Sequence, residues 1–334
     1  MEPDPSSPSL PWRFGSAAVM GFIGTVSRVF IYGANSQETH GLDGFLELID
    51  ERADIDNRNR GLLTAFSSFF TLGQVLPTHR LHHSPHGGPF QPTIREAVRL
   101  LSRPPFRSTD TRSPVDRSLQ SPDISDPFSS PSDIYTYTTN GTDTFPAPSA
   151  YATRQYSWIH IFPEGRVHQH PRKTMRYFHW GVARLILEPD VCPDIVPMWI
   201  EGNNEIMHEN RAAPRWLPRV GKQCAVWIGK NVGGEREGVF HELRRKWRKL
   251  VEDNKRKGSG ALEMGVLNDH LKYGEEAVAL RKECTMQVRR EVLAVRRLRG
   301  LPDEDPKESL VETYWEEGGK REGKMADGSL VKDT

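Results

Sequence analysis

Short apolar runs bounded by turn residues recur in the middle of the chain. Residues 157–162 (SWIHIF), 195–200 (IVPMWI) and 224–228 (CAVWI) are of this kind, and such runs are typical of buried strands in a covered sheet. Residues 61–64 begin a similar run, and residues 178–187 carry apolar side chains at a spacing that suits a packed helix. Strands that alternate with helices predict an α/β fold in which helices flank a sheet.

The C-terminal third is predicted to be helical and charged. Phe240, Leu243, Trp247 and Leu250 recur at helical spacing with basic residues between them, and a second helix is expected over residues 275–298. A basic amphipathic helix either touches anionic lipid or forms the solvated outer face of a globular fold. The sequence leaves both interpretations open.

The N-terminal residues 1–33 form a candidate membrane-interface segment. A start rich in Pro and Ser is followed by a mostly apolar stretch, which glycines and Arg28 interrupt. This stretch lacks the basic start of a secretory signal, and it does not reach the roughly 18 consecutive apolar residues of a membrane span. Aromatic side chains suited to anchoring at a lipid interface lie along it, namely Trp12, Phe14, Phe22 and Phe30. The alternative is an ordinary buried helix.

Composition divides the rest of the chain into further regions. Residues 34–101 and 154–235 are the two parts of the predicted α/β domain, and residues 236–300 hold the charged helices. Residues 102–153 are rich in Ser, Pro, Thr and Asp without a hydrophobic period, so a disordered insert is predicted. Residues 301–334 carry 10 acidic and 5 basic side chains and are expected to be a disordered acidic tail.

Composition and charge narrow the classes of function. The chain has 334 residues with 45 basic and 44 acidic side chains, whereas a nucleic-acid-binding domain is normally strongly basic. The three cysteines lie far apart and form no C-x-x-C pair, so neither a disulfide framework nor a zinc knuckle is predicted. Four histidines cluster without an accompanying carboxylate or cysteine, so no metal site is predicted from them. They are His79, His82, His83 and His86.

The most informative motif is the FPEGR turn at residues 162–166, directly after the first predicted strand. Pro163 and Gly165 favour a tight turn, which places Glu164 and Arg166 at the edge of the sheet. Open α/β sheets bind ligands beyond the carboxyl ends of their strands. A guanidinium group suits phosphate, and a carboxylate accepts a hydrogen bond from a hydroxyl group. Alone, however, such a turn is common in proteins without this function.

The turn resembles the third sequence block of the glycerolipid acyltransferase family, and other segments resemble the phospholipid–lysophospholipid transacylases of that family. These segments follow one another in the family's order and cover most of the chain outside the Ser/Pro-rich insert and the acidic tail. They are residues 12–33, 70–80, 158–167, 178–186, 195–205, 218–221 and 228–230.

This resemblance implies a glycerolipid-acyltransferase-like sheet flanked by helices. It implies acyl transfer between a phospholipid and a lysophospholipid without coenzyme A or another cofactor, including the remodelling of cardiolipin at mitochondrial membranes. The implied partners are these lipids and a cardiolipin-containing membrane surface, with no nucleic acid, and the oligomeric state stays open. The residues implied to hold the acceptor's glycerophosphate are Glu164, Gly165, Arg166 and Arg80. Those implied to form the pocket wall are Phe162, Pro163, Val196 and Pro197.

The family's first block, a His followed five positions later by an Asp, is absent from this chain. In that block the imidazole takes the proton of the attacking hydroxyl group, and the carboxylate orients the imidazole. None of the 12 histidines has Asp at the fifth following position. The resemblance runs to Thr64 and resumes at Ala65 with sequence from beyond the block, which indicates a deletion between these residues. We therefore predict that the chain as written is inactive or nearly so.

Two hypotheses follow from these observations. In the first, the chain is a lipid transacylase that uses another base, or it is an incomplete form of an active sequence. In the second, it is a catalytically inactive, membrane-bound lipid- or partner-binding scaffold. The histidine cluster at residues 79–86 is one alternative source of a base. We expect His160 to be satisfied within the core and His168 and His170 to lie in a loop.

Overall fold

The computed structural model describes residues 10–53, 58–65, 88–103, 136–137, 145–146, 155–214, 217–234, 237–259, 264–317, 323–324, 328 and 330–332.

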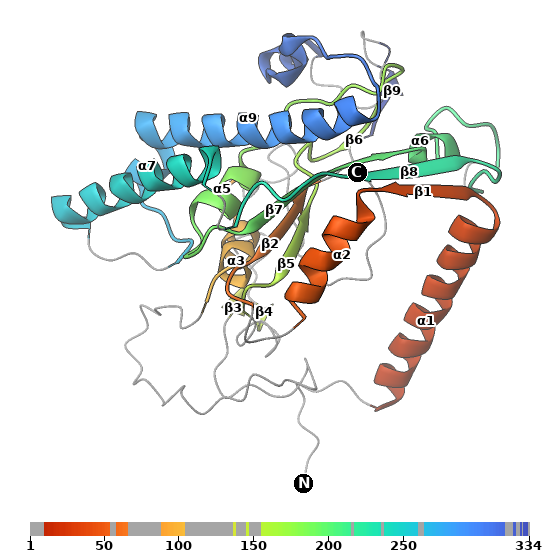
Figure 1. Cartoon of the computed structure of the whole chain (residues 1–334), viewed down its shortest axis with the longest axis horizontal. Coiled ribbons are helices and arrows are strands. Elements are labelled where there is room, and N and C mark those ends of the chain that lie inside the picture. The colour runs from red at the N-terminus through yellow and green to blue at the C-terminus, as the bar shows by residue number, and fades with distance from the viewer. Residues whose placement is uncertain are drawn as a thin grey trace.

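A five-stranded sheet lies at the centre of the molecule, in the order β1-β8-β7-β2-β5 (Figure 1). In that order its strands are Ser36–His40, Gln223–Ile228, Asp194–Glu201, Leu62–Ala65 and Trp158–Ile161. β2 runs parallel to both of its neighbours, β7 and β5, whereas β7 and β8 are antiparallel. The carboxyl ends of β2 and β5 therefore meet at one edge, where open α/β sheets bind their ligands.

Helices pack on both faces of this sheet (Figure 1). One face is covered by α3 (Pro92–Leu100), α5 (Gly181–Leu187), α7 (Val239–Asn254) and α9 (Glu275–Leu298). Every residue of α5 is buried, because this short helix lies against α3, α7 and α9. On the opposite face, Leu48 of α2 (Leu42–Glu51) packs against Leu62 and Val196. The expected α/β fold with flanking helices is confirmed.

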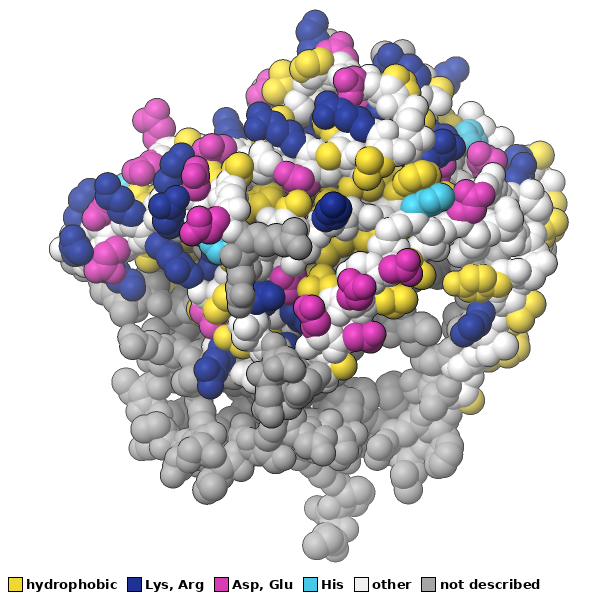
Figure 2. Space-filling view, in the orientation of Figure 1, with side chains coloured by type: hydrophobic (Ala, Val, Ile, Leu, Met, Phe, Trp, Pro, Cys, Tyr) yellow, Lys and Arg dark blue, Asp and Glu magenta, His cyan; other side chains and the backbone are white. Residues whose placement is uncertain are grey.

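The outer surface of α7 is basic. Its apolar residues Phe240, Leu243, Trp247 and Leu250 are buried in the main core, and Arg244 is buried as well. The exposed side carries Arg245, Lys246, Arg248 and Lys249, and basic side chains gather over this helix in Figure 2. This arrangement agrees with the interpretation of a solvated outer face. On α2 the exposed side is instead acidic, with Asp43, Glu47, Asp50 and Glu51.

The buried carboxylate of Asp194 joins the segments at the start of β7. It accepts hydrogen bonds from Arg60 at 2.9 Å, from Arg52 at 3.3 Å and from Asn231 at 2.7 Å. Asp194 is only 1% exposed, and these partners compensate the buried charge. The network fixes the amino ends of β2 and β7 relative to the end of α2.

α1 (Leu10–Gly33) extends away from the body of the protein as one continuous helix (Figure 1). Large apolar side chains on it are exposed, including Phe22 at 70% and Val29 at 65%. The alternative of an ordinary buried helix is therefore wrong for these side chains. The side chains of Trp12 and Phe14 lie outside the described residues. Within the described ranges, no helix combines the length and the apolar character needed to cross a membrane.

The C-terminal region is more structured than the sequence suggested. Residues 301–317, here called the C-terminal strap, contain the 3-10 helices η3 (Pro306–Ser309) and η4 (Glu312–Glu317). Further on, β10 (Leu330–Lys332) pairs with β6 (Val167–Gln169) and with β9 (Gly323–Lys324). The expectation of a disordered tail therefore differs from the structure in these segments.

The remaining described elements are short. They are β3 (Thr136–Tyr137), which pairs with β4 (Phe145–Pro146) within the region expected to be a disordered insert, and α6 (Asn203–Ile206), η2 (Lys255–Ser259) and α8 (Asp269–Tyr273).

Candidate functional site

The FPEGR turn lies between β5 and β6, at the carboxyl end of β5. The backbone N–H of Gly165 donates to the carbonyl of Phe162 at 3.0 Å, and the N–H of His179 donates to the carbonyl of Pro163 at 2.8 Å. These bonds close the turn and attach it to the segment that leads into α5. The structure thus puts the turn at the sheet edge where the sequence predicted it.

Gly165 occupies a position that other residues adopt only with strain. Its φ angle is +69°, in the left-handed region that favours glycine. A Cβ atom at this position would lie 2.8 Å from Cδ2 of His179 and 2.9 Å from its Nε2. The imidazole of His179, which is exposed, therefore lies directly against the turn. Sequence reasoning overlooked this histidine because no local motif connects it with residue 165.

Glu164 points into the protein. The side chain is 8% exposed, and its carboxylate accepts a hydrogen bond from the backbone N–H of Arg176 at 3.0 Å. Burial raises the pKa of Glu164 to about 7. The N–H of Arg176 and the charges of Arg176 and Arg289 oppose this shift, while the charge of Glu304 adds to it.

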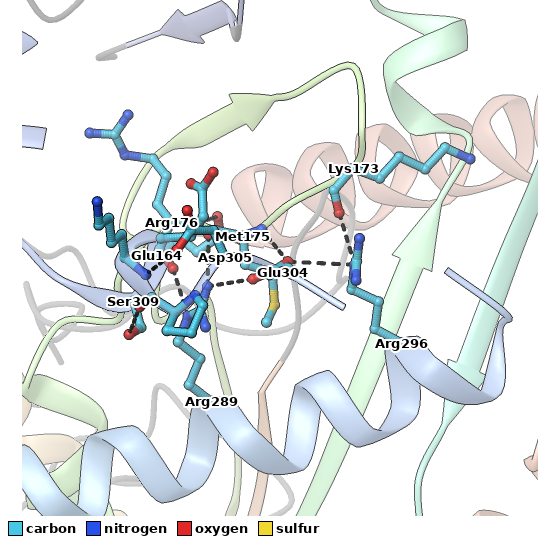
Figure 3. A network of polar contacts seen from close by, with 12 residues as sticks. Glu164, Lys173, Met175, Arg176, Arg289, Arg296, Glu304, Asp305 and Ser309 are labelled. Atoms are coloured by element: carbon cyan, nitrogen blue, oxygen red, sulfur yellow. Dashed lines mark hydrogen bonds and ion pairs between the residues drawn. The ribbon is translucent and has the colours of Figure 1, made fainter. Parts of the chain in front are cut away.

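A network of buried charges surrounds Glu164 on the α9 side of the sheet (Figure 3). Arg289 of α9 pairs with Glu304 of the C-terminal strap at 2.5 Å, and Arg296 approaches Glu304 at 3.5 Å. The backbone N–H of Met175 donates to the same carboxylate at 2.7 Å. Arg289 and Glu304 could not have been predicted as neighbours of the turn, since only long-range contacts bring them there.

His160 lies on the other face of the sheet, towards α2. Its Nδ1 is 2.6 Å from Oγ1 of Thr64, the residue opposite it on β2. Oγ1 of Thr64 also accepts a hydrogen bond from Nε1 of Trp158 at 3.0 Å. Burial lowers the pKa of His160 to about 4. At neutral pH this imidazole is therefore uncharged and only weakly basic.

The implied wall residues do not share one face of the sheet. Val196 is buried with Leu48 on the α2 side, whereas Pro197 meets Gly229 on the α9 side, where a Cβ at Gly229 would lie 2.8 Å from Pro197 Cγ. Neighbouring residues of a strand point to opposite faces. Phe162 packs edge-on against His160 with ring centroids 4.9 Å apart. Phe162 and Val196 therefore lie on the His160 side of the sheet.

Several predicted features lie outside the described residues. Arg80 and the histidine cluster at residues 79–86 are among them, so the structure does not place Arg80 relative to Glu164 and Arg166. Arg166 itself is half-buried at the end of the turn. The suspected deletion falls at the end of β2, whose last residue is Ala65. Within the part of the chain that the structure describes, no cluster of His, Cys, Asp or Glu could hold a metal ion.

The chain is similar to known tafazzins. It is 33% identical to the tafazzin of Saccharomyces cerevisiae over 266 residues, which are 77% of this chain and 61% of the yeast protein. A stretch of 79 residues, 22% of this chain, is 37% identical to a taffazin of Dictyostelium discoideum and covers 26% of that protein. A stretch of 78 residues, 23% of this chain, is 36% identical to N-acylphosphatidylethanolamine synthase of Arabidopsis thaliana and covers 27% of that protein. No protein-family model matches the chain.

The mixed sheet with flanking helices and the turn after β5 define an α/β protein with an acyltransferase-like fold. The relatives that match the chain are thus tafazzins and an N-acylphosphatidylethanolamine synthase. The chain is similar to a tafazzin over 77% of its length, as the resemblance in sequence predicted. The chain spans 61% of the length of the yeast tafazzin and about a quarter of the other two relatives.

Proposed function

We propose that the chain is a phospholipid acyltransferase, which exchanges a fatty acyl chain between a phospholipid and a lysophospholipid. The exchange would be of the kind that remodels cardiolipin at mitochondrial membranes. The observation that carries this proposal is the closed turn at the carboxyl end of β5, in which Glu164 is held by Arg176 and Gly165 adjoins His179. The tafazzin relatives support the acyltransferase class.

In this proposal the two faces of the sheet bind different parts of the lipid. The turn and the charged groups on the α9 side hold the phosphate and glycerol of the acceptor. On the α2 side, Leu42, Leu46, Trp158 and Phe162 are 39%, 46%, 52% and 41% exposed. Phe45 of α2 packs edge-on against Trp158 with ring centroids 5.7 Å apart, and exposed apolar patches commonly mark binding surfaces. We assign the acyl chain to this surface.

The absence of the His and Asp pair of the family's first block limits the rate of acyl exchange in this proposal. His160 is a poor substitute, because its pKa of about 4 makes it a weak base and its Nδ1 contacts Thr64. His179 is the imidazole that lies against the turn, and we assign to it the proton of the acceptor hydroxyl group. Loss of one member of a comparable triad costs on the order of 10⁴ in rate. We therefore expect slow exchange.

The test is acyl exchange between labelled phosphatidylcholine and lysocardiolipin. We expect slow exchange above the buffer rate, which His179→Ala abolishes while the circular dichroism spectrum is unchanged. His270→Ala, a change on α8, is the matched control and should exchange as the parent does. Exchange that persists in folded His179→Ala removes the assignment of the base.

A second candidate is a non-catalytic lipid-binding scaffold. The inward orientation of Glu164 favours it, because a carboxylate that holds the backbone of Arg176 keeps the turn in shape without any catalytic step. In that case the parent chain binds liposomes that contain lysocardiolipin but shows no acyl exchange. Measuring both properties on one preparation separates the two candidates.

We propose that the protein works at a membrane surface, with α1 as its contact with lipid. The exposed apolar side chains of this helix, Phe22 and Val29 among them, support this. An exposed apolar helix is costly in water and is stabilised when lipid covers it. Cardiolipin-containing mitochondrial membranes are the surface that we propose, from the relationship to tafazzins.

A further inference from the structure

Two buried arginines of α9 converge on one carboxylate. The side chains of Arg289 and Arg296 are 3% and 1% exposed, and that of Glu304 is 2% exposed. Both guanidinium groups also donate to backbone carbonyls of residues 172–176, which fixes their positions. With the N–H of Met175, three groups that carry hydrogen-bond donors surround Glu304 (Figure 3).

This set of donors is also suited to a phosphate group. Planar guanidinium groups bind carboxylates and phosphates through the same paired geometry. A backbone N–H adds a donor that carries no charge and cannot rotate away. Glu304 is bound by Nη2 of Arg289 and by the N–H of Met175, with Nε of Arg296 at 3.5 Å, and phosphate oxygens can accept from the same donors.

The place of the cluster in the fold is that of a ligand site. Arg296 lies over the ring of Trp199, 5.7 Å from its centroid. Trp199 is two positions beyond Pro197, which pairs with Ala65 at the end of β2. The cluster thus lies beyond the carboxyl end of β2, where open α/β sheets bind ligands. It also adjoins the turn, because the N–H groups of Met175 and Arg176 bind Glu304 and Glu164 respectively.

We propose that Arg289, Arg296 and the N–H of Met175 form a phosphate-binding site, which Glu304 fills when no ligand is bound. The inference rests on the proposed function, since a lysophospholipid acceptor would bring the phosphate to this edge of the sheet. If Glu304 left alone, two buried guanidinium groups would lose their counter-charge, which is strongly unfavourable. Release of Glu304 is therefore coupled to the entry of an anion.

The later part of the C-terminal strap, η3 and η4, is attached to the protein through Arg176 and not through the arginines of α9. The guanidinium group of Arg176 stacks over the ring of Tyr314 at 4.0 Å, and the hydroxyl group of Tyr314 donates to Glu308 at 2.5 Å. These contacts involve neither Arg289 nor Arg296. Asp305 caps η3 and stays with it. Residues 301–304 contact α9 through Arg296 and Arg297, so they can move without the release of η3 and η4.

Hydrogen exchange on the unmodified full chain tests directly whether phosphate displaces Glu304 from the two arginines. Inorganic phosphate or micelles of lysophosphatidate are added, and exchange is followed in peptides that cover residues 301–305 and Met175. We expect faster exchange at residues 301–304, while the N–H of Met175 stays protected because phosphate replaces Glu304. A response to both ligands shows that the phosphate group suffices, and a response to one of them identifies the source. No response to either overturns the proposal.

A pair of variants supplies the second measurement. Glu304→Gln keeps an oxygen for the N–H of Met175 but removes the competing charge, so inorganic phosphate should bind roughly tenfold tighter. Glu308→Gln, a change within the C-terminal strap that leaves both arginines untouched, should bind as the parent does. Arg289→Met added to Glu304→Gln should abolish the gain. An unchanged affinity of folded Glu304→Gln for inorganic phosphate contradicts the proposal. If this variant does not fold, the hydrogen-exchange experiment on the unmodified chain tests the proposal instead. Acyl exchange is measured separately, so failure of the proposed function leaves these readouts intact.

Discussion

Glu164 and Glu304 accept hydrogen bonds from adjacent backbone N–H groups, those of Arg176 and Met175. One carboxylate belongs to the turn after β5 and the other to the C-terminal strap. Burial is the largest cause of the raised pKa of Glu164, and the nearby carboxylate of Glu304 adds to it. The C-terminal strap thereby affects the electrostatics of the FPEGR turn.

The raised pKa of Glu164 predicts a dependence of stability on pH. A carboxyl group whose pKa is about 7 in the folded protein, against an ordinary value of 4.5, binds its proton more tightly when folded. Its contribution to the free energy of unfolding is therefore greatest below pH 4.5 and falls as the pH rises towards 7. Glu164→Gln removes this dependence. Urea titrations of both proteins between pH 4.5 and 7.5 measure the difference, and parallel curves would contradict the raised pKa.

Gly165→Ala should damage the turn, and Gly221→Ala is its matched control. Both glycines have φ near +70°, but a Cβ at Gly221 meets nothing within 4 Å, whereas one at Gly165 meets the ring of His179. Both variants carry the backbone strain of about 1–3 kcal/mol. Only Gly165→Ala also displaces His179, so it alone should lose acyl exchange. Equal losses of exchange in the two variants would show that the contact with His179 has no functional role.

Local patterns predicted the central elements because burial in the sheet demands apolar runs. The helix expected over residues 275–298 is α9, and the run at 195–200 lies within β7. The helix expected over 178–187 begins only at Gly181, because the N–H of His179 is bonded to the turn. The direction of β8 relative to β7 could not be predicted, since an apolar run carries no information on direction.

The C-terminal strap shows what local patterns miss. It is polar and lacks a hydrophobic period, which is typical of disorder, yet Glu304 is buried because α9 supplies Arg289 and Arg296. Only the folded chain brings these partners together. Exposed β1 was missed for a related reason, because all but its last residue are exposed and no alternation marks the strand.

Thr64→Val should destabilise the sheet through unsatisfied polar groups. Thr64 is fully buried, and its hydroxyl group contacts both His160 and Trp158. Valine has a similar shape but leaves these two groups without that partner, at a cost of about 1–3 kcal/mol. Thr39→Val on exposed β1 is the control and should change the free energy of unfolding by less than about 0.5 kcal/mol. Chemical denaturation measures both variants, and a neutral Thr64→Val would show that the hydrogen bonds contribute little.

Replacing exposed apolar residues of α1 should weaken binding to membranes. The variant Phe22→Ser, Val26→Ser, Val29→Ser removes side chains that are 70%, 50% and 65% exposed in the structure. Burial of apolar area drives interfacial binding. Binding to liposomes that contain cardiolipin, measured by cosedimentation, should therefore weaken by at least about tenfold. The free energy of unfolding of the α/β domain should stay unchanged. Leu298→Ser, which removes a 71% exposed side chain at the end of α9, is the control and should bind as the parent does. If the triple variant sediments like the parent, lipid contact lies elsewhere on the protein, and the basic outer surface of α7 becomes the surface to test.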